Sequence, residues 1–203
     1  MGSLNIFCVT DKPLRHLEDL NIKLAGVGNK KFSKKYITCL SGKNIQKKEK
    51  YYSELTFHYW FWKNKLKSYR NSDWIGFCQK RRFWLKSPSK IRNLRDLKKK
   101  IITKPKKKWI KYESIICKPI RVDNPKRMKL IKRGWKNILI DPSVINQKKK
   151  QNIKLHFDMH HGFGVLDKAI NIMKNEDIEK FREFVNKETK FNPHIMVISK
   201  KKF

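Results

Sequence analysis

Three residues able to transfer protons stand close together in the C-terminal third of this 203-residue chain. Asp158, His160 and His161 fall within four positions and are followed by Gly162. A histidine charge-tuned or oriented by a carboxylate suits general-base chemistry near neutral pH, and a glycine permits close approach of a ligand. These residues are therefore the candidate catalytic group, and a structural role for the histidines is the alternative.

The same segment contains an H-x-x-x-H spacing at His156 and His160. On a helix this spacing would suit a metal ion. Residues 153–158, however, alternate between apolar and polar types, which predicts a strand with one wet face. On a strand the two histidines would stand roughly 13 Å apart, too far to share one ion. We therefore expect no metal site here.

Two adjacent arginines, Arg81 and Arg82, follow the apolar segment 73–78. Guanidinium groups bind phosphate oxygens bidentately and stabilise a departing negative charge without a metal. The sequence has no D-x-D pattern that would hold a divalent ion instead. The pair is thus a candidate phosphate site, although it could equally cover a sheet end or pair with carboxylates.

The elements that must position these residues alternate between strands and helices. Short apolar runs predict strands at 4–10, 36–40, 73–78, 114–117, 153–158 and 194–199, and apolar periodicity predicts helices at 53–68, 91–101, 165–174 and 177–187. We interpret Ser53 and Asn175 as helix caps, and residues 21–29 as a loop. This order predicts an α/β fold with a mostly parallel sheet. In such sheets ligands bind outside the carboxyl ends of the strands, where Thr10-Asp11, Gln79 to Arg82 and Asp158 to Gly162 would lie.

The composition is strongly basic, with 51 Lys and Arg against 17 Asp and Glu and a net charge of +34. This charge fits nucleic-acid binding, attraction to an anionic membrane surface, or solvated lysines without a partner, and it does not choose among them. A hydrophobic content of 39% excludes a disordered chain. Four cysteines without a C-x-x-C pair indicate a reduced protein in which Cys8 and Cys78 are core residues.

Three segments resemble the family of capsular-polysaccharide or lipopolysaccharide glycosyltransferase-like domains. They are Ile6 to Pro13, Tyr51 to Asn64 (YYSELTFHYWFWKN) and Asp73 to Phe83 (DWIGFCQKRRF), with weaker matches at Phe157 to Gly162 and Phe191 to His194. The helix segment followed by the arginine strand is a specific pair, and the segments occur in the family's order. Gln79-Lys80 replaces the His-Tyr that the family has before the two arginines.

The resemblance implies a Rossmann-like, GT-A-like nucleotide-sugar transferase fold with the donor at the carboxyl ends of the strands. It implies a hexosyltransferase that moves a sugar from a nucleotide-sugar to a glycan or lipid-linked acceptor of capsule or lipopolysaccharide. The donor-binding candidates are Thr10, Asp11, Glu54, Thr56, Gln79, Arg81 and Arg82. We expect no cofactor, since the nucleotide-sugar is a substrate, and metal-independent binding of its diphosphate.

We expect one glycosyltransferase-like domain over residues 1–203, shortened at its C-terminal end. Within it, residues 87–151 would form a basic and partly irregular insertion. A cytoplasmic protein with peripheral contact to the inner face of an anionic membrane fits the charge. Two alternatives remain open. One is a basic RNA-binding or ribosome-associated protein, and the other is a non-catalytic relative that retains sugar binding.

Overall fold

The computed structural model describes residues 2–173 and 177–201. It divides the chain into two compact units, which are described separately. Unit 1 comprises residues 1–117 and 194–203, and unit 2 comprises residues 118–193. The segment 87–151, expected as an insertion, is shared between the two units, and the single domain over 1–203 stays a prediction.

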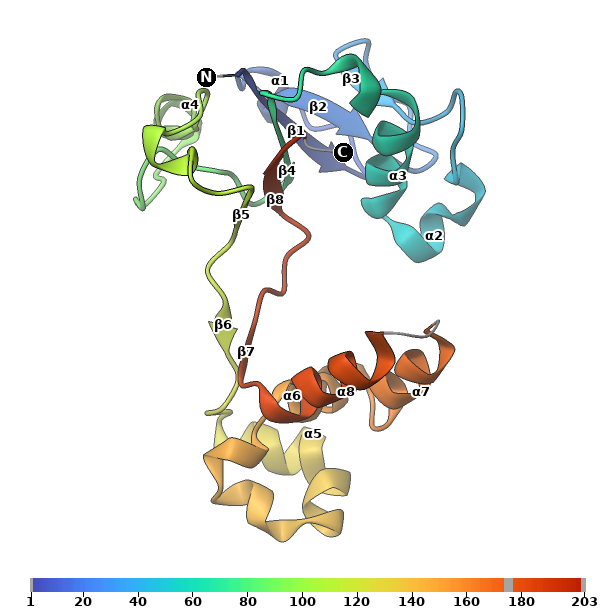
Figure 1. The fold of residues 1–203 in the computed structure, drawn as a ribbon, viewed down its shortest axis with the longest axis vertical. Coiled ribbons are helices and arrows are strands. Elements are labelled where there is room, and N and C mark those ends of the chain that lie inside the picture. The colour runs from blue at the N-terminus through green and yellow to red at the C-terminus, as the bar shows by residue number, and fades with distance from the viewer. Residues whose placement is uncertain (1, 174–176, 202–203) are drawn as a thin grey trace. The chain divides into compact units, whose positions relative to one another are not determined.

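Unit 1 is built on a six-stranded sheet with the order β3-β2-β1-β4-β8-β5 (Figure 1). Its strands are β1 (Leu4–Thr10), β2 (Lys23–Gly26), β3 (Tyr36–Thr38), β4 (Trp74–Gln79), β5 (Ser114–Ile116) and β8 (Val197–Lys200). The first four are mutually parallel, with Cys8 beside Cys78 in the register of β1 and β4. Only β8 runs in the opposite direction, between β4 and β5. The expected α/β fold with a mostly parallel sheet is confirmed.

Alternate residues of β1 enter two different hydrophobic layers, as the period of a strand requires. Phe7 and Val9 pack with Phe57, Trp60 and Phe61 of α3 (Leu55–Asn64). Ile6 and Cys8 pack on the other face, where α1 (Arg15–Glu18) and α4 (Leu94–Lys100) contribute Leu17 and Leu97. Cys8 and Cys78 are buried and free, as predicted.

The helix at the signature segment differs from its prediction in two ways. Ser53 does not cap it with its side chain: α2 (Glu49–Tyr52) ends there, Ser53 has φ 46°, and α3 starts at Leu55. The i, i+4, i+7 and i+11 spacing of Leu55, Tyr59, Trp62 and Leu66 also predicts one buried apolar stripe. This prediction is wrong for Leu55 and Trp62, which are exposed, while Phe57 and Phe61 are buried. Nearly every position of this segment is apolar, so periodicity alone could not select the buried face.

The other strand and helix predictions for unit 1 hold, but the short helices α1 and α2 and the strand β2 were not predicted. Strand β2 occupies residues that were expected to form a loop. Its four residues end in Gly26, which leaves a run too short for a clear strand pattern. Residues 66–68 form a separate 3-10 turn after α3. The remaining short 3-10 turns of unit 1 are at 46–48 and 107–109.

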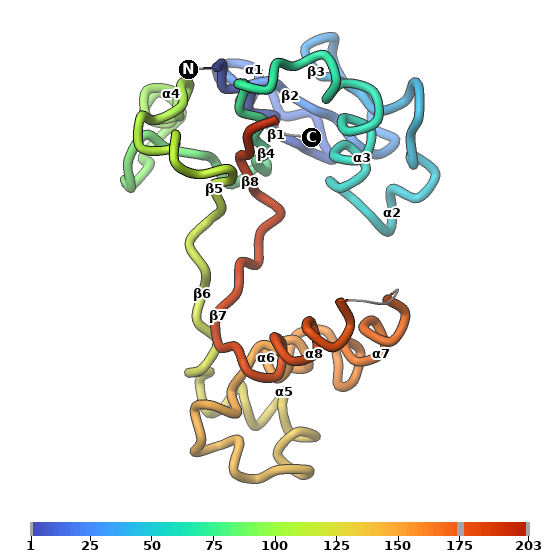
Figure 2. The backbone as a smooth tube through the Cα atoms, viewed as in Figure 1, coloured from blue at the N-terminus to red at the C-terminus, as the bar shows by residue number. Residues whose placement is uncertain are grey.

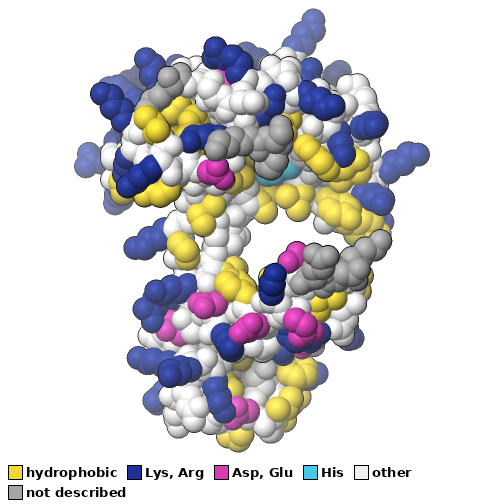
Figure 3. All heavy atoms as spheres, in the orientation of Figure 1, with side chains coloured by type: hydrophobic (Ala, Val, Ile, Leu, Met, Phe, Trp, Pro, Cys, Tyr) yellow, Lys and Arg dark blue, Asp and Glu magenta, His cyan; other side chains and the backbone are white. Residues whose placement is uncertain are grey.

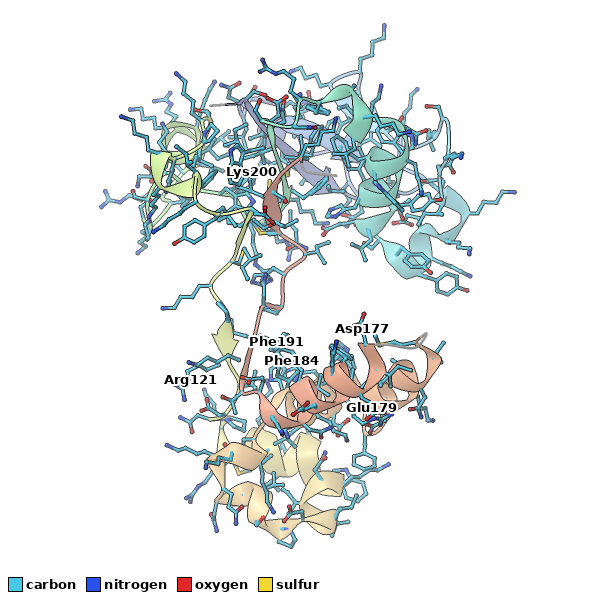
Figure 4. The ribbon with its side chains drawn as sticks, viewed as in Figure 1. Arg121, Asp177, Glu179, Phe184, Phe191 and Lys200 are labelled. Carbon is cyan, nitrogen blue, oxygen red and sulfur yellow. The ribbon has the colours of Figure 1, made fainter. Side chains whose placement is uncertain are left out.

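Unit 2 is mainly helical. Its first and last elements are short strands that pair with each other in an antiparallel two-stranded sheet. Its elements are β6 (Ile120–Arg121), α5 (Arg127–Ile140), α6 (Ile153–His161), α7 (Val165–Ile172), α8 (Ile178–Lys187) and β7 (Lys190–Phe191), with 3-10 turns at 142–145 and 148–150. The tube in Figure 2 follows the chain through β6, the helices and back along β7. Figure 4 labels Arg121 and Phe191 on the two paired strands, and Phe184 on α8.

The predicted strand at residues 153–158 is wrong, because these residues belong to α6. Asn152 caps this helix by accepting a hydrogen bond from the backbone nitrogen of Leu155 at 3.0 Å. Leu155 and Met159, four residues apart, are buried in one cluster, as the helix period requires, and Ile153 is buried in a second cluster. The other predicted helices of unit 2 are confirmed as α7 and α8, whereas the Asn175 cap lies outside the described residues. Among the described helices, none has the length and apolar character that crossing a bilayer requires.

Candidate functional site

A cationic cavity lies in unit 1 at the carboxyl ends of β1 and β4, two neighbouring parallel strands. Its volume is about 230 Å³, and it is lined by Lys12, Leu14, His16, Lys80 and Arg81. Parallel strands bring their carboxyl ends to one edge of the sheet, so the turn after β1 and the turn after β4 meet there. Of the two arginines expected at a phosphate site, Arg81 lines this cavity.

The turn after β1 is fixed by the side chain of Thr10. The Thr10 hydroxyl accepts a hydrogen bond from the backbone nitrogen of Lys12 at 3.1 Å and donates to the Lys12 carbonyl at 2.8 Å. The next part of the turn is held by the Tyr36 hydroxyl, which accepts from the Leu14 nitrogen at 3.0 Å. Thr10 therefore places Lys12 at the cavity. Its own side chain is fully buried, and contact of Thr10 with a donor stays a prediction.

Asp11 and Lys80 join the two turns through an ion pair between the Asp11 carboxylate and the Lys80 ammonium. This hydrogen bond lowers the pKa of the Asp11 carboxyl below its usual value. Lys12 and Arg81 are exposed, and among the described residues neither forms a salt bridge with a carboxylate, in contrast to Lys80. The cavity thus has a net positive charge even with His16 neutral.

Arg82 belongs to a second group at the same strand end. The Arg82 guanidinium donates to the Gln79 side-chain oxygen at 3.2 Å, and the Gln79 amide donates to Glu54 at 2.6 Å. A tight turn closes between Gln79 and Arg82 through backbone hydrogen bonds in both directions. The structure therefore brings together Glu54, Gln79 and Arg82, and it separates the roles of the two arginines.

Thr56 is the predicted donor-binding residue least available to a ligand. Its side chain is fully buried in the first turn of α3, and its hydroxyl has no hydrogen-bond partner within the described part of the chain. A buried hydroxyl of this kind costs stability, so a partner or a movement of α3 would be favourable. Contact of Thr56 with a donor remains a prediction.

Asp158, a candidate catalytic residue in unit 2, is engaged in holding the end of α6. It is buried, accepts a hydrogen bond from the Gly164 backbone nitrogen at 3.1 Å, and faces the Lys154 ammonium at 3.4 Å. Within the described part of the chain, Asp158 does not form the expected carboxylate-histidine hydrogen bond with His160 or His161. This geometry gives Asp158 a structural role.

His160 lies on the other side of α6 and makes two contacts of its own. Its Nδ1 lies 2.7 Å from the His156 carbonyl oxygen, and its Nε2 lies 2.9 Å from the Lys129 ammonium. This arrangement fits a tautomer in which Nδ1 carries the proton and Nε2 accepts from Lys129. His161 stacks instead on Phe157, with ring centroids 4.3 Å apart. His160 also lines, with Asp158, an open depression of about 490 Å³.

The separation expected for His156 and His160 is overturned by the helix. Their ring centroids are 4.3 Å apart, because residues four apart share a helix face. Burial lowers the pKa of His156 to about 4, with the neighbouring His160 and Lys129 acting in the same direction. The described residues contain no group of three or more His, Cys, Asp or Glu side chains placed to hold a metal ion.

The predicted site residues thus fall into separate groups. Asp11, Glu54, Gln79, Arg81 and Arg82 lie at one edge of the sheet of unit 1, while Asp158, His160 and His161 belong to unit 2. Sequence reasoning missed Lys12, His16 and Lys80 as cavity residues. The signal for Lys12 and Lys80 was their position directly after apolar strands, whereas nothing in the sequence distinguished His16.

Comparison with known proteins finds a match to one family model and a similar fold in one solved structure of low sequence identity. A family model described as a domain of unknown function, DUF4422, matches residues 5–203. The chain belongs to the DUF4422 family. No curated protein matches.

A solved structure described as the WbbM bifunctional glycosyltransferase in its apo form has a similar fold. The TM-score is 0.55 at 17% sequence identity, over 98% of this chain and 34% of that chain. This DUF4422 chain thus spans about a third of the length of the solved protein it resembles. At this identity the likeness shows a shared α/β fold, consistent with the sheet and helices described above.

Proposed function

We propose that this DUF4422 protein is a glycosyltransferase that takes a sugar from a nucleotide-sugar donor and passes it to a capsule or lipopolysaccharide acceptor. The observation that carries the proposal is the cationic cavity at the carboxyl ends of β1 and β4. Its place in the sheet is where open α/β folds bind ligands, and its charge suits a diphosphate. The fold shared with WbbM supports a transferase of this kind.

The two turns at this edge offer different groups to a donor. Arg81 and Lys12 would bind the diphosphate, since both are exposed at the cavity and Arg81 can engage two phosphate oxygens at once. Arg82 would add positive charge beside them, held in place by Gln79 and Glu54. Asp11 positions Lys80, which adds a further cation. This set of side chains would stabilise a leaving diphosphate without a metal ion.

His160 is the best placed of the three catalytic candidates to deprotonate an acceptor hydroxyl. Its ring is exposed, and its Nδ1 is held by the His156 carbonyl, which leaves Nε2 as the basic nitrogen. An acceptor hydroxyl would have to displace Lys129 from Nε2. In this proposal Asp158 fixes the end of α6 and His161 packs on Phe157.

Nucleotide binding to the full chain tests the diphosphate site directly. We expect uridine or guanosine diphosphate, or their sugar conjugates, to bind in isothermal titration with excess chelator present. Arg81→Ala should weaken binding by about 10- to 150-fold, since a charge-assisted hydrogen bond contributes about 1.5–3 kcal/mol. Arg95→Ala, at an exposed arginine on α4, is the matched control and should bind as the wild type does.

Three results would contradict parts of this proposal. Equal binding by the Arg81 and Arg95 variants would remove the cavity from the donor site. Complete loss of binding with chelator would overturn metal independence. Tight RNA binding with a steep salt dependence, without any nucleotide response, would favour the RNA-binding alternative.

A further inference from the structure

Helix α5 in unit 2 has an apolar face that does not contribute to the hydrophobic core. Met128, Ile131, Trp135 and Leu139 follow one another at helical spacing, so they form one stripe along the helix. They are 63%, 50%, 51% and 72% exposed. A helix that buries one face in the core normally has polar residues on its solvent-exposed face. Here four apolar side chains are exposed to solvent instead.

The core-facing side of α5 is separate and well packed. Leu130 is buried in a cluster with Leu155 and Met159 of α6. Gly134 lies against the same cluster, since a Cβ atom there would be in ordinary van der Waals contact with the side chain of Met159 at 3.5 Å. The stripe is therefore not needed to hold α5 on α6.

Cations flank the stripe on the side away from the core. α5 carries Arg127, Lys129, Lys132, Arg133 and Lys136 and has no acidic residue between Arg127 and Ile140. Lys132 lies four residues after Met128 and three before Trp135, and Lys136 lies three before Leu139, so both lysines are next to the stripe on the helix surface. Figure 3 shows how widely Lys and Arg side chains cover the face in view.

We propose that α5 lies in the interface of an anionic lipid bilayer, with the stripe inserted among the acyl chains and the adjacent lysines on the lipid headgroups. An interfacial helix combines an apolar face, a tryptophan and a polar face rich in Lys and Arg. Each basic residue near an anionic surface adds to the attraction. The inference does not depend on the proposed donor site, because it rests on other residues and on a different ligand.

Charge and side-chain type select this partner over others. A second copy of the chain would bring two strongly cationic surfaces together, which like-charge repulsion opposes. Nucleic acid would suit the lysines, but Met128, Ile131 and Leu139 have no ring to stack on a base and no group to bind a phosphate. A bilayer with anionic headgroups matches the apolar and the cationic parts at once.

Flotation of the full chain with lipid vesicles tests the proposal. We expect binding to phosphatidylcholine vesicles that contain about a third phosphatidylglycerol, weaker binding at high salt, and little binding to pure phosphatidylcholine. Trp135→Ser with Leu139→Ser should reduce the bound fraction about tenfold, and Lys132→Glu with Lys136→Glu should do the same.

Matched controls distinguish membrane binding by α5 from nonspecific binding through other exposed apolar or basic residues. Ile172→Ser removes an isoleucine that is 82% exposed on α7, and Lys98→Glu with Lys99→Glu removes two exposed lysines of α4. Both controls should bind vesicles like the wild type. Equal losses in controls and α5 variants would overturn the assignment to α5, as would wild-type binding by the α5 variants.

Two further outcomes would also overturn the proposal. If Trp135→Ser with Leu139→Ser lowers the thermal stability of the free chain, the stripe is covered within the protein. If these substitutions abolish RNA binding while the wild type ignores anionic vesicles, the partner is a nucleic acid. Nucleotide binding measured on the same variants should be unchanged, so a failure here leaves the donor site to its own test.

Discussion

The side-chain amide of Gln79 donates a hydrogen bond of 2.6 Å to Glu54, which ties the end of β4 to the start of α3. The side-chain oxygen of Gln79 accepts a hydrogen bond from the Arg82 guanidinium at 3.2 Å. Gln79 stands where the resembling family has a histidine, and here the amide satisfies both neighbours at once. One glutamine therefore positions a carboxylate and a guanidinium at the edge of the candidate donor site.

Gln79→Met should destabilise unit 1 and weaken nucleotide binding together. The change keeps the length of the side chain but removes both hydrogen bonds, and it leaves the partly buried Glu54 without its partner. We expect a loss of about 1–3 kcal/mol in the free energy of unfolding, measured with urea. Gln147→Met, at an exposed glutamine, is the control, and equal stability of the two variants would contradict the role given to Gln79.

Asp158→Asn should lower stability more than Asp167→Asn. Asp158 is buried and accepts from Gly164 while it faces Lys154, whereas Asp167 pairs with Lys154 at 3.0 Å from a more exposed position. An amide in place of Asp158 leaves Lys154 less well compensated in a half-buried place. We expect a difference of about 1–3 kcal/mol in chemical unfolding. Unchanged stability with lost transferase activity would instead assign Asp158 to catalysis.

Stability should fall as the pH is lowered from about 6.5 towards 4. Burial lowers the pKa of His58, which stacks on Phe77 with ring centroids 4.0 Å apart, to about 4. The pKa of His156 is also about 4. In this range the unfolded chain binds protons at these positions and the folded chain does not, so acid favours unfolding.

Urea midpoints measured between pH 7.5 and 4.5 check this dependence. His58→Gln and His156→Gln should each flatten the curve below pH 6.5, because each removes one group that takes up a proton on unfolding. His16→Gln is the control, since His16 is exposed. A slope that stays the same in all three variants would show that other groups control the acid response.

Gly76→Ala should destabilise the sheet by about 1–3 kcal/mol through overpacking. A Cβ atom at Gly76 would lie 2.9 Å from a side-chain carbon of Ile198 and 3.2 Å from one of Ile6. Replacing Ile198 with Ala in the same chain removes the contacted Cγ1 atom, so the two losses should be less than additive, a coupling that a double-mutant cycle measures. Strictly additive losses would contradict the contact between β4 and β8.

The parts of the fold that could be predicted are those where one pattern dominates. The strands β1 and β4 are short and mainly apolar, and the polar residues that follow them mark the edge of the sheet. Helix α6 was mistaken for a strand because Ile153, Leu155 and Phe157 alternate with polar residues, and only the cap at Asn152 indicates a helix. Helix α5 was not predicted, since its many lysines and Gly134 conceal its periodicity.

The candidate site was predicted in part for a similar reason. Position after a buried strand was sufficient to indicate Asp11, Arg81 and Arg82. The same reasoning grouped Asp158 with His160, because on a short loop or strand end they would be neighbours. On α6 the two residues are about 200° apart around the helix, so their side chains have different hydrogen-bond partners, although both residues line the same open depression.

The position of β8 has a consequence for how the protein is made. This strand lies between β4 and β5, both of which precede the whole of unit 2 in the sequence. During synthesis β5 has no neighbour in the sheet until residues 197–200 emerge, and β4 has an open edge for the same period. Completion of unit 1 thus waits for unit 2, so a ribosome stalled within the helices would hold an unfinished sheet that is prone to aggregate.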